Sequence, residues 1–183
     1  MIKQNLPETF NLDIGCGYLP QEGFIGLDKR NLDTVTIVQD VEEFPWPIKD
    51  NSVKIALCSH LLEHLNPQKI LDFFEEVHRI LVPGGSFFIA VPYAGSFQAY
   101  QDPTHVRPGF NEATWNYFDP REFLWGIYRP SPFLIEDLEF RQDASMRVRL
   151  RCIKPEWVKE GKVSQEILEI FKQKQVKGFY END

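Results

Sequence analysis

The side chains best suited to chemistry follow two short apolar segments near the start of the chain. The first segment runs into Asp13-Ile14-Gly15-Cys16-Gly17, and the second ends in Gly26-Leu27-Asp28. Glycines after a strand let the backbone approach a ligand where a Cβ atom would collide, and an acid that ends the next strand accepts hydrogen bonds from both ribose hydroxyls. Together these residues predict a nucleoside site, although a Gly-x-Gly pair alone is equally typical of an ordinary tight turn.

Two histidine-containing segments suggest further chemistry. His105 can take up a proton near neutral pH, with Asp102 as its orienting partner or as the base itself; the alternative is a loop histidine that only hydrogen-bonds its neighbours. The segment His60-Leu-Leu-Glu63-His64 fits the H-x-x-E-H pattern of zinc proteases. A zinc site of that kind needs a sustained helix, whereas Asn66-Pro67 starts a new helix two residues later, so we expect no bound metal.

Short β-favouring segments must position these residues. They span Thr9–Ile14, Phe24–Leu27, Thr36–Gln39, Val53–Cys58 and Ser86–Val91. Several are apolar on both faces, which is typical of parallel strands in a sheet that helical crossovers cover on both sides. The clearest helix is Pro67–Leu81, which leads through Val82-Pro83-Gly84-Gly85 into the fifth segment. The pattern predicts an α/β fold.

The second half of the chain has a different character. Residues 93–133 hold 11 of the 25 Phe, Tyr and Trp residues and five prolines, with short helical segments only at 112–118 and 121–125. So long a connection is typical of a lid or binding loop. Residues 133–140 and 147–153 predict an antiparallel strand pair at the sheet edge, and Ser164–Val176 a closing helix. Arg147, Arg149 and Arg151 share one strand face, where they would hold an anionic acceptor or lie in solvent.

Composition limits the class of protein. The 183 residues, of which 43% are hydrophobic and 26% charged, predict a single folded domain over residues 1–183. The net charge of −7 disfavours a broad nucleic-acid surface. No apolar run is long enough to span a bilayer and the N-terminus lacks a secretion signal, so we expect a cytoplasmic protein. The three dispersed cysteines fit reduced thiols, and nothing in the sequence fixes the oligomeric state.

The order of these motifs resembles the class I S-adenosylmethionine-dependent methyltransferases, in particular the small single-domain type 11 kind. The resemblance covers residues 9–92 and rests on the glycine turn, Asp28, Gln39-Asp40-Val41, Ser59-His60 and Pro83-Gly84-Gly85. It implies a Rossmann-like methyltransferase fold, with a mostly parallel sheet, an antiparallel terminal strand pair and a lid over the carboxyl edge. It also implies transfer of a methyl group from S-adenosylmethionine to a small-molecule or sugar-type acceptor.

The resemblance also assigns roles to individual positions. It places the methionine end of the cofactor at the glycine turn, the ribose at Asp28 and the adenine beside the end of the third strand. The implied cofactor-binding residues are Asp13, Gly15, Cys16, Gly17, Asp28, Asp40, Val41, Ser59 and His60. Candidates for the wall of the acceptor pocket are Tyr93, Tyr100, Trp115 and Tyr117, although aromatic residues at such spacing are more often plain core.

The first crossover departs from the usual dinucleotide pattern. Only ten residues, Tyr18–Leu27, separate Gly17 from Asp28, whereas a dinucleotide site places its acid about 20 residues on. The crossover must shrink to about one turn, which argues against a nicotinamide dinucleotide, whose pyrophosphate requires a helix N-terminus there. Two alternatives to an active methyltransferase stay open, namely a catalytically silent nucleoside-binding protein and a zinc hydrolase.

Overall fold

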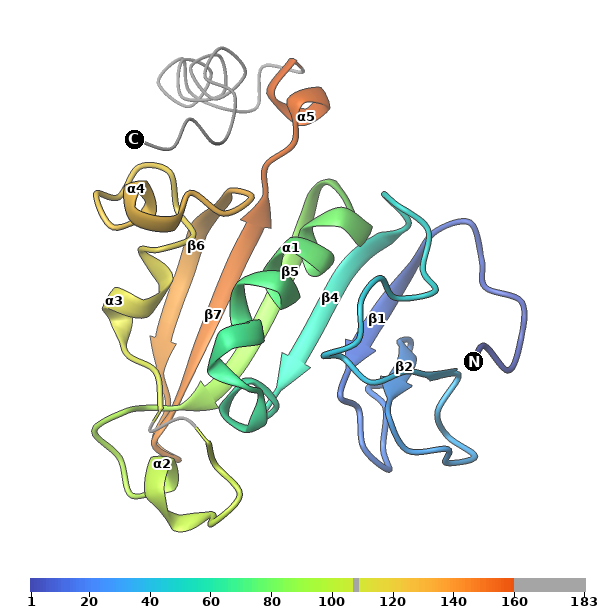
Figure 1. Cartoon of the computed structure of the whole chain (residues 1–183), viewed down its shortest axis with the longest axis horizontal. Helices are drawn as coiled ribbons and strands as arrows, with labels where there is room; N and C mark the ends of the chain where they lie inside the picture. The colour runs from blue at the N-terminus through green and yellow to red at the C-terminus, as the bar shows by residue number, and fades with distance from the viewer. Residues whose placement is uncertain (107–108, 160–183) are drawn as a thin grey trace.

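A seven-stranded sheet forms the centre of the computed structural model, which describes residues 1–106 and 109–159 (Figure 1). The strand order is β3-β2-β1-β4-β5-β7-β6. Strands β1 to β5 are parallel, and β7 lies antiparallel between β5 and β6. The strands are β1 (Phe10–Ile14), β2 (Ile25–Asp28), β3 (Ile37–Val38), β4 (Val53–Ser59), β5 (Leu81–Pro92), β6 (Phe133–Phe140) and β7 (Ser145–Cys152). The predicted α/β fold with an antiparallel terminal strand pair is confirmed.

Helix α1 (Ile70–Ile80) follows a 3-10 turn over Pro67–Lys69, as the sequence predicts. The Asn66 side chain accepts a hydrogen bond from the Gln68 backbone N–H, which caps the turn. One face of the helix is buried against the sheet through Phe73, Phe74 and Val77. The chain then enters β5 at Leu81, earlier than predicted, so that Pro83-Gly84-Gly85 lies within the strand rather than before it.

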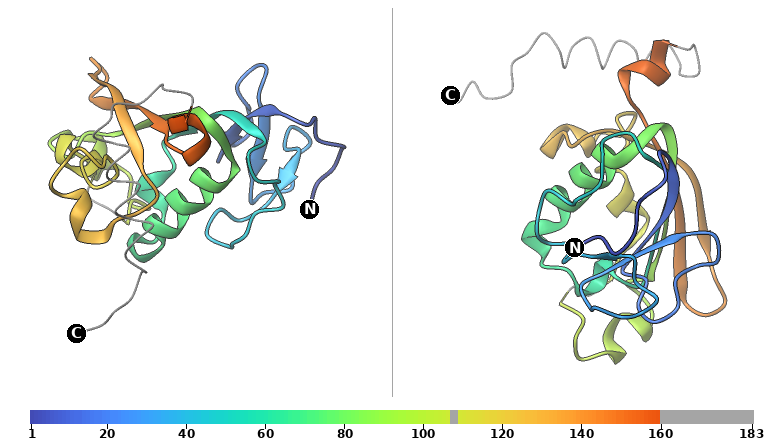
Figure 2. Two further views of the ribbon diagram at one scale, coloured as in Figure 1. Left: turned by 90° about the horizontal axis from the view of Figure 1, so that it is seen from above. Right: turned by 90° about the vertical axis from the view of Figure 1, so that its right-hand side faces the viewer.

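The described helices leave one face of the sheet open. Helix α1, α3 (Glu112–Trp115) and α4 (Trp125–Tyr128) lie on one side, and Figure 2 shows the sheet bare on the other side over the described residues. The expectation of helical cover on both faces is therefore wrong for the described part of the chain. The physical reason is the short first crossover, which has room for a turn but not for a helix.

Only the beginning of residues 93–133 has the position expected of a lid. The segment around α2 (Gln98–Gln101) lies beyond the carboxyl ends of β4 and β5 (Figure 1). The later part, with α3 and α4, packs beside α1 instead. The rings of Phe118 and Phe74 stack with 3.8 Å between their centroids, and Trp115 is fully buried in the same core. Several aromatic residues of this part are therefore core, although Phe123 and Tyr128 are exposed, and the expectation of one lid over 93–133 is corrected.

The buried carboxylate of Asp119 links the connection 93–133 to the edge strand β6. Asp119 is fully buried and accepts hydrogen bonds from the backbone N–H and the guanidinium of Arg121 and from the backbone N–H of Ile135 in β6. Removing one partner of such a network leaves buried donors without acceptors. We expect Asp119→Ala to lower the free energy of unfolding by about 3 kcal/mol in urea titrations. The exposed neighbour Glu122 is the control, and equal losses for Glu122→Ala would contradict this reading.

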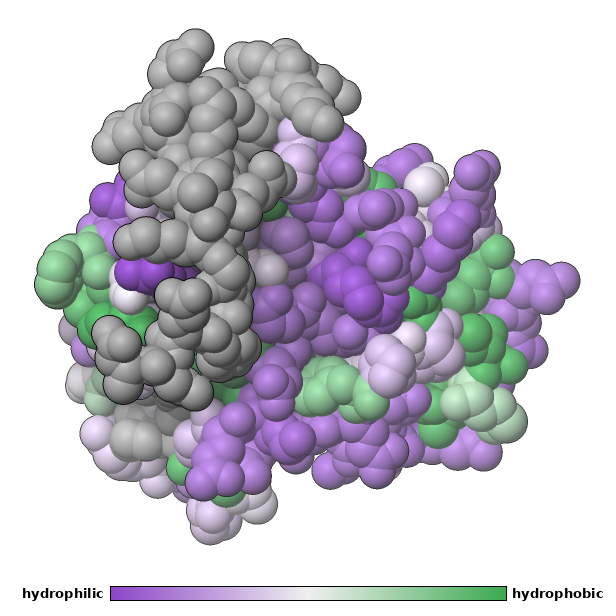
Figure 3. Space-filling view, turned by 45° about the horizontal axis from the view of Figure 1, so that its top comes forward, coloured by the Kyte–Doolittle hydropathy of each residue, from purple (hydrophilic) through white to green (hydrophobic). Residues whose placement is uncertain are grey.

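The described chain ends in α5 (Pro155–Lys159), where the Trp157 ring occupies the space beside Gly84, which has a φ of +73°. The predicted helix at 164–176 lies outside the described residues. Within the described part, the chain has no helix of the length and apolar character that crossing a membrane requires. The described surface visible in Figure 3 is mostly hydrophilic, with apolar side chains gathered only in small patches.

Candidate functional site

The chain leaves β1 through a glycine turn beside the point where the strand order reverses. Gly15 and Gly17 have φ angles of +71° and +63°, which favour glycine. The backbone N–H groups of Gly15 and Cys16 donate to the Leu27 carbonyl at 2.8 and 3.1 Å, which fastens the turn to β2. A Cβ atom on Gly15 would lie 2.8 Å from Leu61 Cδ2. The turn therefore has no room for a side chain at this position.

Asp28 ends β2 directly beside this turn. Its carboxylate is buried and accepts hydrogen bonds from Gly17 N–H at 2.9 Å, from Arg30 N–H at 2.9 Å and from the Arg30 guanidinium at 3.0 and 3.1 Å. Burial alone would raise the pKa of Asp28, but the bonds from Arg30 and Gly17 outweigh it and leave the pKa below its usual value. The Arg30 side chain is 46% exposed and its guanidinium lies 4.9 Å from the centre of the Tyr18 ring.

The lowered pKa of Asp28 has a consequence for stability. A carboxylate with a lower pKa in the folded state stabilises the fold above its ordinary pKa of 3.8, and this contribution disappears as the pH falls through the folded value. We expect Asp28→Asn to be less stable than the unaltered protein at pH 7. The two unfolding free energies should converge below pH 3.8. A difference that stays constant from pH 7 downward would show that the carboxylate charge is not the cause.

The end of β3 meets Asp28 from the other side. The Gln39 backbone N–H donates to the Asp28 carbonyl at 3.0 Å, and the next two residues, Asp40 and Val41, form a turn in which Asp40 Oδ1 accepts from Glu42 N–H at 3.0 Å. Asp40 is half-buried and Val41 is buried. The structure thus brings the ends of β1, β2 and β3 together, as the nucleoside hypothesis requires.

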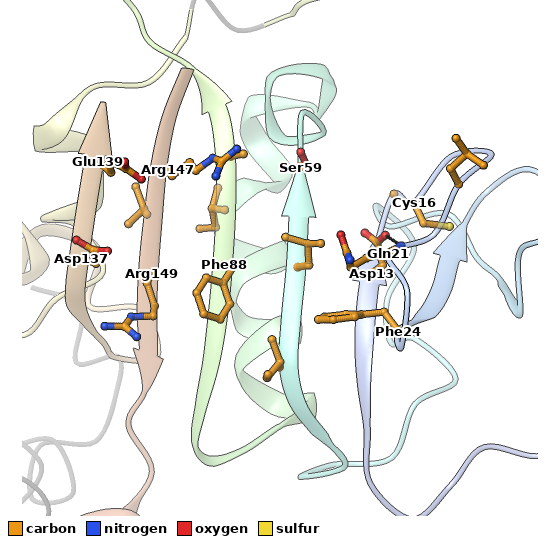
Figure 4. A pocket seen from close by; sticks show the side chains of 17 residues that line it. Asp13, Cys16, Gln21, Phe24, Ser59, Phe88, Asp137, Glu139, Arg147 and Arg149 are labelled. Carbon is orange, nitrogen blue, oxygen red and sulfur yellow. Dashed lines mark hydrogen bonds between the residues drawn. The ribbon is translucent and has the colours of Figure 1, made fainter. Parts of the chain in front are cut away.

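The larger of two hollows, about 800 Å³ in volume, lies on the open face of the sheet (Figure 4). This volume lies within the range of small-molecule sites. Its lining comes from β1, β4, β5, β6 and β7 and from the glycine turn, and it includes Asp13, Gly15, Cys16 and Ser59. Gly17, Asp28 and Asp40 are not among its lining residues. The predicted cofactor residues therefore divide between this hollow and the neighbouring strand ends, where Arg30 lies on Asp28.

Asp13 and Cys16, which line the larger hollow beside the glycine turn, have shifted pKa values. Burial raises the pKa of Asp13, and the hydrogen bond from Gln21 N–H at 2.8 Å offsets part of that rise. Burial, reinforced by the carboxylates of Asp13 and Asp28, raises the pKa of Cys16 to about 11. The Cys16 thiol is therefore protonated at neutral pH, which does not suit a nucleophile.

The smaller hollow, about 210 Å³ in volume, lies at the carboxyl ends of β4 and β5. Consecutive residues line the two hollows: Ser59 lines the larger one and His60 the smaller one. On β5, Ala90 lines the larger hollow and Pro92 the smaller one. The lining of the smaller hollow is mostly polar and comprises His60, Glu63, Pro92, Gln98, Gln101, Asp102 and His105. The two hollows therefore have neighbouring lining residues at the carboxyl ends of β4 and β5.

The segment after β4 does not form the helix of a zinc protease. His60 has a φ of +52°, and only one 3-10 turn, η1 (Leu62–His64), follows it. His60 Nδ1 lies 3.1 Å from Glu63 Oε1, and this contact raises the pKa of His60. His60 and His64 therefore do not share the face of a sustained helix, and the H-x-x-E-H interpretation fails on geometry.

The structure brings His105 to the smaller hollow but pairs it differently from the prediction. His105 Nδ1 lies 3.1 Å from the Ala99 carbonyl. Asp102 Oδ1 accepts instead from the Thr104 backbone N–H at 2.8 Å and hydroxyl at 2.7 Å, and these bonds lower the pKa of Asp102. Asp102 therefore positions Thr104, and the Ala99 carbonyl orients the His105 imidazole. The prediction that Asp102 orients His105 is corrected.

The expected aromatic wall does not form around either hollow. Trp115 is fully buried in the core, and Tyr100 is 68% exposed. The rings of Tyr93 and Tyr117 contact Phe140 and Tyr128. None of the four residues lines either hollow.

Sequence reasoning missed several contributors to these sites. Arg30 forms an ion pair with Asp28. The two-residue spacing of these opposite charges is the signal that could have revealed the pair. Gln98 and Gln101 line the smaller hollow, and no pattern in the sequence marked them. The three arginines 147, 149 and 151 lie on β7, which is the neighbour of the edge strand β6. Arg149 and Arg151 form ion pairs with Glu136, and Arg147 and Arg149 line the larger hollow.

Comparison with known proteins identifies part of the chain. Residues 12–89, which run from β1 into β5, match the family described as "Methyltransferase domain". Over these residues the chain is similar to methyltransferase domains. No curated protein matches the sequence.

Solved structures show the same fold over most of this chain. A SAM-dependent methyltransferase from Archaeoglobus fulgidus aligns with a TM-score of 0.60 at 18% identity, over 78% of this chain and 86% of that one. One from Aquifex aeolicus gives 0.56 at 14%, over 80% and 83%. A putative type 11 methyltransferase from Sulfolobus solfataricus gives 0.53 at 20%, over 81% and 86%. The predicted Rossmann-like methyltransferase fold is confirmed.

The residues of the matched segment fit S-adenosylmethionine, the cofactor that the resemblance implies, if one side chain moves. The bare α-carbons of the glycine turn and the buried Asp28 carboxylate suit a nucleoside. In the structure Arg30 donates to Asp28 the hydrogen bonds that ribose hydroxyls would donate. Its Nη2 lies 3.3 Å from the position that a Cβ on Gly17 would have. Because the Arg30 side chain is half-exposed, its guanidinium can be released into water without crossing the protein interior.

Proposed function

We propose that this chain transfers the methyl group of S-adenosylmethionine to a small, polar, hydroxyl-bearing or sugar-type acceptor. The observation that carries the proposal is that the consecutive residues Ser59 and His60, at the carboxyl end of β4, line the larger and the smaller hollow. The cofactor supplies an activated methyl group when it is bound. The polar lining and small volume of the second hollow favour a compact acceptor with hydrogen-bonding groups.

The protein's own residues act mainly by positioning in this proposal. Asp28 would hold the ribose, the turn over Gly15–Gly17 would receive the methionine part, and the end of β3 at Asp40 and Val41 would meet the adenine. The smaller hollow would align the acceptor oxygen, with His105 Nε2 toward it, because Nδ1 is held by the Ala99 carbonyl. Alignment of two reactants contributes about 7–11 kcal/mol to such a reaction. The acceptor hydroxyl would pass its proton to His105 Nε2 as its oxygen takes the methyl group and adenosylhomocysteine leaves.

The test separates binding from turnover. Calorimetry with adenosylhomocysteine measures occupation of the cofactor site, and release of adenosylhomocysteine in the presence of hydroxylated sugars and related small acceptors measures transfer. We expect one cofactor per chain and turnover with at least one acceptor of this class. Binding without turnover across the panel would favour the silent nucleoside-binding alternative, and absence of binding would overturn the proposal.

A further inference from the structure

Three potential ligand side chains lie close together beside the smaller hollow, on segments about forty residues apart. Glu63 and His105 line that hollow, and His64 is not among its lining residues. Glu63 and His64 come from the turn η1 after β4, and His105 comes from the segment that follows α2 (Figure 1). The Val106 backbone N–H donates to the Glu63 carbonyl at 3.0 Å, which holds the two segments together. The His64 and His105 rings lie 4.8 Å apart at their centroids. The fold therefore creates a cluster that no local pattern contains.

Glu63 carries an unsatisfied oxygen in this cluster. Its side chain is 1% exposed, and His60 Nδ1 contacts Oε1 at 3.1 Å. The other oxygen, Oε2, is buried without a hydrogen-bond partner among the described residues. A buried carboxylate oxygen without a donor or a cation is costly. The arrangement therefore calls for a positively charged partner at Oε2.

The hydrogen bonds of both histidines leave the same ring nitrogen free. The Ala99 carbonyl near His105 Nδ1 can only accept, so that nitrogen carries the proton and Nε2 keeps its lone pair. The Thr104 hydroxyl donates to Asp102 and therefore accepts at 3.1 Å from His64 Nδ1–H, which again leaves Nε2 free. Histidines that ligate metals are oriented in this way by a carbonyl or another acceptor on the second nitrogen.

We propose that Glu63, His64 and His105 bind a divalent first-row transition metal ion, with Zn²⁺ as the probe. One potential ligand atom from each residue lies within 4.8 Å of the others. Two imidazoles and one carboxylate are a ligand set of zinc sites that keep an open position, whereas Ca²⁺ and Mg²⁺ favour oxygen ligands. Adjacent ligand atoms on a tetrahedral zinc ion lie about 3.4 Å apart, so the ion would draw the segment 102–106 toward η1.

This site differs from both earlier expectations about metal. The sequence predicts no metal, and the H-x-x-E-H reading would use His60, which here contacts Glu63 rather than the ion. An ion with an open position toward the smaller hollow would bind the acceptor oxygen and lower its pKa, in place of a direct contact with His105. That role rests on the proposed function, whereas the ion site itself does not.

The experiment titrates Zn²⁺ into chelator-treated full-length protein, with a chromophoric chelator as competitor. We expect one ion per chain and a higher unfolding temperature with Zn²⁺. Glu63→Gln and His105→Ala should each weaken binding by about 100-fold, and Thr104→Val, which removes a positioning hydroxyl, by about 10-fold. The exposed acid Glu112 supplies the matched control, Glu112→Gln, which should bind as the unaltered protein does.

Two results would overturn the inference: no ion bound at a stoichiometry near one, or equal affinity in the unaltered protein, Glu63→Gln and His105→Ala. His105 lies on a partly exposed segment, so its variant tests the site even where Glu63→Gln unfolds. Adenosylhomocysteine binding is measured in the metal-free protein alongside. Cofactor binding without ion binding would overturn only the metal site, and ion binding without cofactor binding would overturn only the proposed function.

Discussion

Replacing Asp28 with alanine should weaken the binding of adenosylhomocysteine by about 100-fold, because two hydrogen bonds to a charged acceptor contribute about 1.5–3 kcal/mol each. Asp28 is the buried acid at the end of β2, beside Gly17 and the end of β3. Titration calorimetry at pH 7 measures the affinity directly.

Two control variants sharpen this result. Asp33→Ala removes an exposed acid on the same connection and should leave the affinity unchanged. Arg30→Ala removes the side chain that now lies on Asp28, so it should leave the affinity unchanged or increase it. If Asp28→Ala binds as tightly as the unaltered protein, Asp28 is an ordinary structural acid and the nucleoside assignment is wrong.

Gly15→Ala should lower the free energy of unfolding by about 3 kcal/mol and abolish measurable cofactor binding. Gly15 has a φ of +71°, and a Cβ on it would lie 2.8 Å from Leu61 Cδ2. Backbone strain and a collision therefore both act on the turn. Urea titration measures the stability and calorimetry the binding.

Gly23 separates the two causes. It has a φ of +80°, but a Cβ there would meet no atom within 4 Å. Gly23→Ala should therefore show the strain alone, at about 1 kcal/mol, and should keep cofactor binding. Equal losses in the two variants would show that the contact with Leu61 has no influence on the turn.

The sequence predicts the parallel strands well because their apolar runs reflect burial that is local to each strand. Val53–Cys58 is found almost at its predicted bounds, and the antiparallel strand Phe133–Phe140 is also found where it was predicted. The sequence misjudges the start of β5, since Pro83-Gly84-Gly85 is typical of a loop although the strand runs through it. The three residues lie at an irregularity between the pairs Val53–Leu81 and Ile55–Ser86. It also assigns Trp115 to a pocket wall, because composition cannot distinguish a buried aromatic residue from one that lines a cavity.

The candidate site is predictable only where its residues follow a strand. Gly15, Asp28 and Ser59 do so, and parallel strands bring their carboxyl ends to one edge. The pairing of Asp102 with Thr104, and the meeting of Glu63 with His105, depend on how a long connection folds back over that edge. Such contacts arise from tertiary packing, which no periodic pattern in the sequence encodes.

The Arg30 side chain acts as a placeholder for the nucleoside, since it satisfies the Asp28 carboxylate in the free protein. Added salt weakens the half-exposed ion pair between Arg30 and Asp28 by screening, because the Debye length falls to about 10 Å at 0.1 M ionic strength. Adenosine is uncharged and must displace Arg30. Its affinity should therefore rise as salt is added, which is the reverse of the trend for a ligand held by charge attraction.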